Sequence, residues 1–233
     1  MFRDNLAIVN HKIAAALALR QTAKITGDKV TLVAVTKNHP PLVVTEALEA
    51  GLADVGENRV QEAKNKKELL PAGGIWHLLG HLQTNKIKQA VELFDIIESV
   101  DSAKVLMHIE HEAAKLNKLQ RVLLQINLTR EEQKSGLSEE DYQLLRTQLA
   151  SYPHVRVEGL MVIAKATDKP EETRPTFARG YQLFCQLQEQ LGSATCTTLS
   201  MGMTHDYWIA IEEGANSVRL GTALFGARDY SIK

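Results

Sequence analysis

The sequence predicts a single (β/α)8 barrel, or TIM barrel, with one extra helix at its N-terminus, forming one domain over residues 1–233. Three observations lead to this prediction. From Val30 onward, eight short segments of strand character follow one another, and helical or turn sequence comes after each. Strand–helix alternation requires parallel strands joined by right-handed crossovers. Eight such units in about 200 residues match the count and size of this barrel class.

The extra helix and the first strand are both indicated by their apolar patterns. Apolar residues recur at the three- and four-residue spacing of a buried helix face, at Leu6, Val9, Ile13 and Leu17. After the turn at Gly27, residues 30–36 form a continuous apolar run with β-branched members. Such a run is typical of a strand buried on both faces. Pro40 and Pro41 then begin a helix, which Gly51 ends.

The other seven strands are predicted where short apolar runs return between turn residues. They are Ala53–Gly56, Ile75–Gly80, Asp95–Ser99, Val122–Leu128, Val155–Val162, Thr197–Ser200 and Ser217–Leu220. Two intervening helices have recognisable ends, since Ser138 and Asp141 have capping-box spacing and Gly192 is placed as a C-cap. An open doubly wound sheet is the alternative, but the Gly-x-Gly-x-x-Gly turn typical of it does not follow the first strand.

Composition and charge exclude several classes of protein. The chain has 27 Lys+Arg against 28 Asp+Glu, so it lacks the broad positive charge of a nucleic-acid binder. Two cysteines, Cys185 and Cys196, cannot form a disulfide framework and suit a reducing compartment. The apolar stretch at residues 13–19 is too short for a signal peptide or a membrane span. We therefore expect a cytoplasmic protein that binds neither membranes nor nucleic acids, and a monomer, because no long apolar surface stripe is visible.

A lysine at the end of the first strand is the first candidate functional residue. Most lysines are solvated surface groups, but Lys37 follows seven residues with the pattern of a barrel strand. In such barrels the functional site lies at the C-terminal ends of the strands. A partly desolvated amine there has a lowered pKa and is a nucleophile for carbonyl groups.

Two small-residue loops, after the seventh and eighth predicted strands, are the second candidate feature. Gly202 and Gly221 lie in these loops among Ser and Thr residues, and a helix is predicted over residues 206–213. Each glycine taken alone could be an ordinary turn residue. Together they occupy the usual phosphate-binding position of this barrel class. A Schiff-base lysine opposite a phosphate site is the arrangement that pyridoxal phosphate requires.

Seven motifs, in order along the chain from about Val30 to Tyr230, resemble those of a known family. They are Val33–Lys37, Gly56–Glu62, Trp76–Gln83, Lys134–Gly136, Gly159–Met161, Leu199–Met203 and Val218–Gly226. The chain is thereby similar to the pyridoxal phosphate homeostasis proteins. Their fold is similar to the N-terminal domain of alanine racemase, which agrees with the barrel predicted above.

The resemblance implies a role for each matching residue. Lys37 would hold pyridoxal 5'-phosphate as a Schiff base, Arg219 would face the pyridine nitrogen, and Asn58 would line the ring. The phosphate would be surrounded by Ser200, Gly202, Met203, Thr204, Gly221 and Thr222. Thr204 stands where the family commonly has a serine, and it keeps the hydroxyl; His81 occupies a variable position.

Three other constellations are interpreted as structural, and no metal site is expected. His77 and His81 straddle a strand end, where residues four apart are separated by about 13 Å. The basic stretch that contains Lys64, Lys66, Lys67, Lys86 and Lys88 is interleaved with glutamates, and a solvated helix face is expected. Glu57 and Glu62 could form an acid pair, but Glu62 is expected to point outward.

The function implied by the resemblance is non-catalytic: intracellular vitamin B6 and amino-acid homeostasis, with transfer of the cofactor to apo enzymes that use it. The alternative is an amino-acid racemase-like enzyme, and residual activity of that kind is compatible with the site. Racemisation needs a base on each face of the ring. In alanine racemase the second base is a tyrosine of a separate domain, and this chain ends at Lys233. A third hypothesis, an enzyme that acts on another phosphorylated substrate through Lys37, fits the site but not the resemblance.

Overall fold

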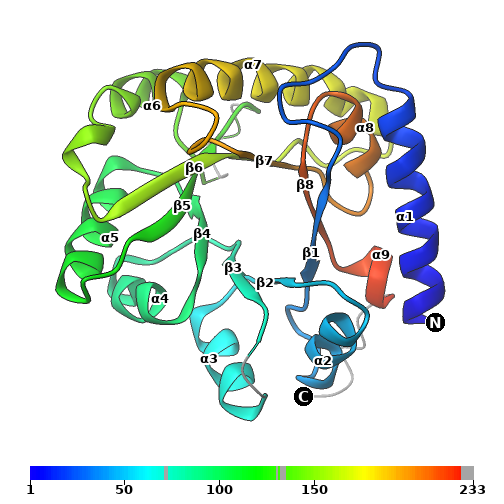
Figure 1. Ribbon diagram of the computed structural model, residues 1–233, viewed down its shortest axis with the longest axis horizontal. Coiled ribbons are helices and arrows are strands. Elements are labelled where there is room, and N and C mark those ends of the chain that lie inside the picture. The colour runs from blue at the N-terminus through cyan, green and yellow to red at the C-terminus, as the bar shows by residue number, and fades with distance from the viewer. Residues whose placement is uncertain (71–72, 130, 132–134, 227–233) are drawn as a thin grey trace.

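Eight parallel strands close into a barrel in the computed structural model, with β8 hydrogen-bonded to β1 (Figure 1). The structure describes residues 1–70, 73–129, 131 and 135–226. The motif residue Lys134 and the predicted end of the similarity at Tyr230 lie outside these ranges. The strands are β1 Thr31–Val35, β2 Asp54–Glu57, β3 Ile75–Leu78, β4 Ile96–Val100, β5 Gln120–Ile126, β6 Val155–Val162, β7 Thr198–Met201 and β8 Ser217–Leu220. The predicted TIM barrel is confirmed.

Helices surround the barrel on its outside, as Figure 1 shows. They are α1 Phe2–Ala18, α2 Leu42–Glu49, α3 Val60–Leu69, α4 Ile87–Leu93, α5 Ala103–Lys115, α6 Glu139–Arg146, α7 Arg174–Leu191, α8 Tyr207–Glu212 and α9 Thr222–Phe225. Short 3-10 turns lie at Thr84–Lys86, Leu149–Ser151 and Pro170–Thr173. The extra helix α1 packs against α8 and α9, and the Asn5 side-chain amide donates to the carbonyl oxygen of Leu224.

Alternating side chains of the strands divide the protein into two buried layers. In β3, Trp76 and Leu78 belong to the large apolar core between strands and helices, whereas His77 points into the barrel. In β4, Glu98 faces inward and contacts His77, while Ile97 belongs to the outer core. The inside of the barrel therefore contains charged groups, each of which needs a partner.

Most predicted boundaries are confirmed within two residues, and the differences have local causes. The predicted strand 122–128 begins earlier, at Gln120, whose buried side chain donates from its amide nitrogen to the carbonyl oxygens of Asp95 and Arg121. The predicted strand 75–80 ends at Leu78. A Cβ on Gly80 would lie 2.2 Å from the carbonyl oxygen of Asn58, so the glycine allows the loop to approach that backbone.

Two predicted helix ends are confirmed in atomic detail. The Ser138 hydroxyl accepts a hydrogen bond from the Asp141 N–H at 3.0 Å and caps α6. Gly192, with φ +83°, ends α7 in a conformation that favours glycine.

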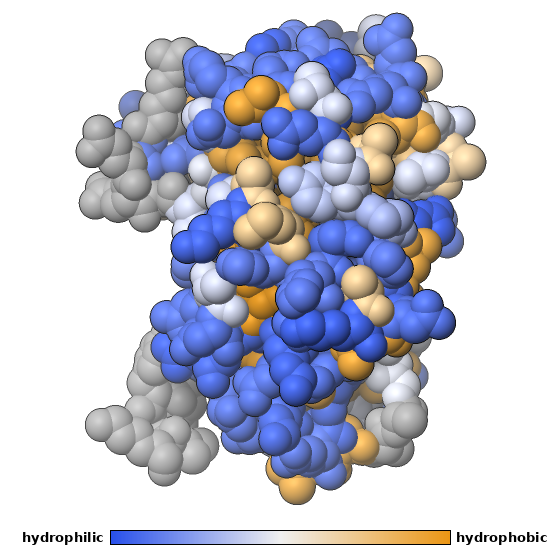
Figure 2. Space-filling model, turned by 90° about the vertical axis from the view of Figure 1, so that its left-hand side faces the viewer, coloured by the Kyte–Doolittle hydropathy of each residue, from blue (hydrophilic) through white to orange (hydrophobic). Residues whose placement is uncertain are grey.

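None of the helices in the described part of the chain is long and apolar enough to cross a bilayer. The face presented in Figure 2 is mainly hydrophilic, and its hydrophobic residues form small groups separated by hydrophilic ones.

Candidate functional site

A cavity of about 250 Å³ opens at the C-terminal ends of the strands, and most of the predicted site residues line it. Seven of the nine lie in its wall: Lys37, Asn58, Met203, Thr204, Arg219, Gly221 and Thr222. Apolar side chains from β1, β6 and the loops after β3 and β6 complete the wall, namely Val35, Leu79, Met161 and Ile163, and His205 lies at its edge. The fold thus brings together residues that are up to 185 positions apart in sequence (Lys37 and Thr222).

The guanidinium of Arg219 is buried and held in one orientation. It donates to the Ser200 hydroxyl at 2.6 Å and to the Val162 carbonyl oxygen at 2.9 Å, and it lies 3.9 Å from a Glu98 carboxylate oxygen. Burial lowers the pKa of Arg219, and the negative charges of Glu98 and Asp206 oppose that shift. The cavity therefore contains a cation whose position is fixed by three separate strands.

A chain of hydrogen bonds continues from Arg219 through the inside of the barrel. Ser200 donates to Glu98 at 2.6 Å, and the two ring nitrogens of His77 lie 2.7 Å from Glu98 and 2.9 Å from Asp54. Burial alone would lower the pKa of His77, but the hydrogen bonds to Asp54 and Glu98 outweigh it and raise the pKa to about 9. His77 is therefore protonated at neutral pH, and the charges of the chain alternate in sign.

The loop between β7 and α8 is folded tightly by Gly202. This residue has φ +93°, and a Cβ on it would lie 2.7 Å from the Tyr207 Cα, so only glycine lets the loop lie against α8. The Met203 N–H donates to the Asp206 carboxylate at 2.7 Å and closes the turn. Ser200 and Gly202 do not line the cavity: the hydroxyl of Ser200 is buried with Glu98 and Arg219, and Gly202 supports the loop from behind.

The loop between β8 and α9 is joined to the first loop by a hydrogen bond. The Thr204 hydroxyl accepts from the Ala223 N–H at 3.2 Å. A Cβ on Gly221 would lie 3.1 Å from the carbonyl oxygen of Val35, so the glycine allows this loop to approach β1 closely. Thr222 begins α9, in which the Leu224 and Phe225 N–H groups both donate to the Gly221 carbonyl oxygen. The hydroxyl-bearing residues Thr204 and Thr222 of the two joined loops therefore line the same cavity.

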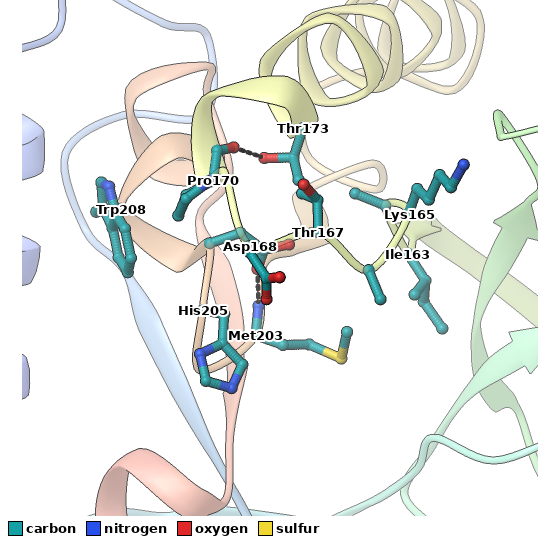
Figure 3. Close-up of a pocket in the computed structure, with 12 residues that line it drawn as sticks. Ile163, Lys165, Thr167, Asp168, Pro170, Thr173, Met203, His205 and Trp208 are labelled. Atoms are coloured by element: carbon teal, nitrogen blue, oxygen red, sulfur yellow. Dashed lines mark hydrogen bonds between the residues drawn. The ribbon is translucent and has the colours of Figure 1, made fainter.

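A larger cavity of about 640 Å³ adjoins the first and shares Ile163, Met203 and His205 with it. Its other side is formed by the segment after β6, which includes Asp168 and Pro170. Figure 3 shows His205 and Met203 on the side of this cavity away from Thr173, with the Lys165 side chain directed away from both. The two cavities therefore share part of their walls.

Two sequence interpretations are wrong in the structure. Lys66 is not part of a solvated helix face, because its side chain is only 4 % exposed and forms ion pairs with Glu57 and Glu62. Glu62 does not point freely outward, because it accepts from Lys66 and from the Asn38 N–H. The four-residue spacing of Glu62 and Lys66 on a helix was the signal in the sequence for this pair.

The two histidines that were considered as a metal pair have separate partners. His77 is bound inside the barrel as described above, whereas the His81 ring lies on the surface, 2.7 Å from Asp101. Within the described part of the chain, no group of three or more His, Cys, Asp or Glu side chains is arranged to hold a metal ion.

The sequence of this chain is similar to those of a known protein family. Residues 14–229 match the family model described as alanine racemase, N-terminal domain. The pyridoxal phosphate homeostasis protein of Pasteurella multocida is 38% identical over 231 residues, which cover 98% of each chain. The protein of the same name from Pseudomonas aeruginosa is 42% identical over 224 residues, with 94% of each chain covered.

Two solved structures have a similar fold. PipY of Synechococcus elongatus PCC7942, determined with PLP bound, superposes with a TM-score of 0.83 at 37% identity and covers 97% of this chain and 100% of its own. An alanine racemase from Clostridium difficile 630 superposes with a TM-score of 0.72 at 16% identity, over 58% of its own length. The second likeness concerns the barrel fold alone.

Proposed function

The chain belongs to the family of the pyridoxal phosphate homeostasis proteins, and on this premise we propose that it binds pyridoxal 5'-phosphate as a Schiff base on Lys37. Its role would be in intracellular vitamin B6 and amino-acid homeostasis. One observation carries the proposal: an amine, a buried guanidinium and two joined donor loops line a single cavity.

The groups around the cavity fit the three chemical parts of this cofactor. The aldehyde needs a primary amine, and Lys37 supplies one at the end of β1. The phosphate, with about −1.5 to −2 charges at neutral pH, suits the hydroxyls of Thr204 and Thr222. The ring would lie against Leu79 and the other apolar wall residues, with Asn58 beside it.

Four of the predicted residues would also shape the site, two from behind the cavity wall and two as part of it. Ser200 fixes Arg219, Gly202 and Met203 shape the loop after β7, and Gly221 brings the loop after β8 close to β1. We therefore propose that all nine residues belong to the cofactor site, seven in direct contact and Ser200 and Gly202 as supports.

We further propose that the protein is a carrier without efficient catalysis of its own. When bound, the cofactor supplies an electrophilic carbon and an electron-withdrawing ring. That ring withdraws electrons most strongly when its nitrogen is protonated, and a neighbouring cation disfavours protonation. Arg219 is held as such a cation by Ser200, Glu98 and Val162. The names of the curated relatives, which refer to homeostasis and not to an enzyme activity, support the same proposal.

Reduction with borohydride tests the assignment of Lys37. Protein loaded with pyridoxal phosphate should show a visible absorption band, and reduction followed by peptide mapping should place the fixed cofactor on the Lys37 peptide. Lys37→Ala should be colourless because it lacks the amine. Lys165→Ala is the matched control, since Lys165 lies at the adjoining cavity. An adduct found mainly on Lys165 or Lys86 would contradict the assignment.

A further inference from the structure

Three charged side chains, of which Glu57 and Lys66 are buried and Glu62 is part-exposed, form a cluster beside the end of β1. The Lys66 ammonium lies 2.6 Å from a Glu57 carboxylate oxygen and 2.8 Å from Glu62. It also donates to the carbonyl oxygen of Thr36 at 2.7 Å. An ammonium has three N–H donors, and here three acceptors surround it. Lys66 is therefore fully engaged and is unsuited to act as a second amine for the cofactor aldehyde.

The cluster contacts the residues on both sides of Lys37. Before it, the Thr36 hydroxyl donates to Glu57 at 2.6 Å, in addition to the bond from Lys66 to the Thr36 carbonyl oxygen. After it, the Asn38 N–H donates to Glu62 at 2.6 Å. The two peptide units that flank Lys37 are thus each attached to a charged group on α3.

The hydrogen bond from the Asn38 N–H to Glu62 lies at a turn with an unusual backbone conformation. Asn38 has φ +59°, in the left-handed region that few residues other than glycine adopt. The turn reverses the chain directly after Lys37, and the hydrogen bond to Glu62 stabilises it. A backbone hydrogen bond from the His39 N–H to the Thr36 carbonyl oxygen, at 3.0 Å, closes the same turn, and the bond to Glu62 adds to it. Losing the bond to Glu62 would loosen the turn and with it the direction of the Lys37 side chain.

Stability alone does not account for such a cluster. Replacing a buried ion pair with apolar residues of similar volume is often neutral or stabilising, because burial removes the hydration of both charges. A buried charged cluster is better explained where its geometry is needed, and here it surrounds the segment that carries the candidate amine.

We propose that Glu57, Glu62 and Lys66 are positioning residues that hold the Lys37 amine toward the cavity. The proposal rests on the proposed function of Lys37 and extends it to residues that do not contact the cofactor themselves. Their effect would be on the rate and extent of covalent attachment, not on the space available for the cofactor.

Two ligands separate these effects. Pyridoxal 5'-phosphate tests covalent attachment, measured as the rate at which cofactor-free protein acquires a borohydride-fixed group on the Lys37 peptide. Pyridoxine 5'-phosphate has an alcohol in place of the aldehyde, so it fills the same cavity without reacting, and its dissociation constant is measured by calorimetry. Misplacing a reacting group by about 1 Å can lower a rate by about 100-fold.

Lys66→Met is the principal variant because methionine keeps much of the volume but has no N–H donors. We expect the attachment rate to fall at least about tenfold, while pyridoxine phosphate binding changes less than about twofold. Lys64→Met is the matched control: Lys64 lies on the same helix, half-exposed, 3.8 Å from Glu68. The control should retain the attachment rate of the wild type.

A pair of variants at Glu62, which is part-exposed, tests the proposal without removing a buried charge from the barrel wall. Glu62→Gln keeps an acceptor for the Asn38 N–H and should restore most of the rate that Glu62→Ala loses. An unchanged attachment rate in folded Lys66→Met, or equal rates in the two Glu62 variants, would overturn the proposal. Equal losses of attachment and of pyridoxine phosphate binding would also overturn it, since they indicate a general structural role. Wild type that forms no adduct on Lys37 would instead overturn the proposed function.

Discussion

Inside the barrel, positively and negatively charged side chains alternate along a chain of hydrogen bonds. Arg219 and His77 are cations, Glu98 and Asp54 are anions, and the Ser200 hydroxyl joins Arg219 to Glu98. Burial would raise the pKa of Glu98, but the hydrogen bond and charge of His77 outweigh it and keep the pKa below its usual value. Each group therefore keeps its charge because its neighbours do.

The His77 imidazolium should titrate far above an ordinary histidine. Its pKa in the folded protein is raised from 6.5 to about 9. Because the folded value is the higher one, its stabilising contribution is fully present below about pH 6.5 and is lost as the pH rises through about 9. The shift corresponds to about 3 kcal/mol of unfolding free energy. NMR titration of the ring, assigned with His77→Gln, should give a midpoint near 9, and urea unfolding should show falling stability over this range.

Glu98→Gln provides the control for this titration. It removes one of the two carboxylates beside the ring, so the His77 midpoint should move toward neutral pH. A wild-type midpoint at or below 6.5 would contradict the charged chain.

The sequence predicted which residues lie at the strand ends, but not which side chains contact one another inside the barrel. The positions of Lys37, Thr204 and Gly221 at the cavity could be predicted because each lies within three residues of the end of a strand, where a barrel has its site. The partners of Glu98 could not be predicted in the same way. A carboxylate in an apolar strand indicates burial, but its contacts with His77 and Ser200 depend on how the barrel closes.

At the scale of elements, strands were predicted well and short helices poorly. The alternation of short strand-like segments with helical sequence located all eight strands, whereas α9 has only four residues, too few to show a helical period. The beginning of α8 was predicted one residue early because Asp206, which has the residue type of an N-cap, uses its carboxylate to close the preceding turn. The junction of the two loops through Thr204 and Ala223 also joins distant segments, which sequence patterns do not reveal.

Gly221→Val should weaken cofactor binding at the loop between β8 and α9. A Cβ at this position already lies 3.1 Å from the Val35 carbonyl oxygen, and the two methyl groups of valine need more space. We expect the loop to move and the dissociation constant of pyridoxal phosphate to rise at least about tenfold, or about 1.4 kcal/mol. Fluorescence titration measures the constant, and thermal unfolding confirms that the variant is folded.

Thr222→Ser and Thr222→Val form a matched pair for the same loop. Serine keeps the hydroxyl and should bind like the wild type, whereas valine keeps the shape and should bind more weakly. If Gly221→Val, Thr222→Val and Ser200→Ala all bind as tightly as the wild type, the phosphate lies elsewhere.

At the scale of the whole molecule, α1 packs against the two helices that follow the candidate loops. Helix α1 packs along α8 and α9 (Figure 1). Arg20, just after it, donates to the carbonyl oxygens of Ile211 and Ala215. The β7–α8 and β8–α9 units are thereby held as one body with α1. This arrangement suits a protein that retains a ligand in a preformed cavity.

We expect the loaded protein to show no efficient turnover of amino acids. Enzymes typically work at about 1–1,000 turnovers per second, so α-proton exchange on a panel of L- and D-amino acids would detect even modest catalysis. Exchange at such a rate, lost in Lys37→Ala, would contradict the carrier proposal; slow exchange would not. The loaded protein should instead activate an apo enzyme that requires pyridoxal phosphate. The rate of activation should be higher than in a parallel incubation with Lys37→Ala and the same amount of cofactor.

The charged chain inside the barrel also has an evolutionary consequence. Because Asp54, His77 and Glu98 satisfy one another in a closed interior, a change at any one of them leaves a buried charge without its partner. Compensating changes at two or three of these positions together would avoid that cost. Among related sequences these positions should therefore covary, and a mutant library that varies them jointly should contain folded proteins that the single-site libraries lack.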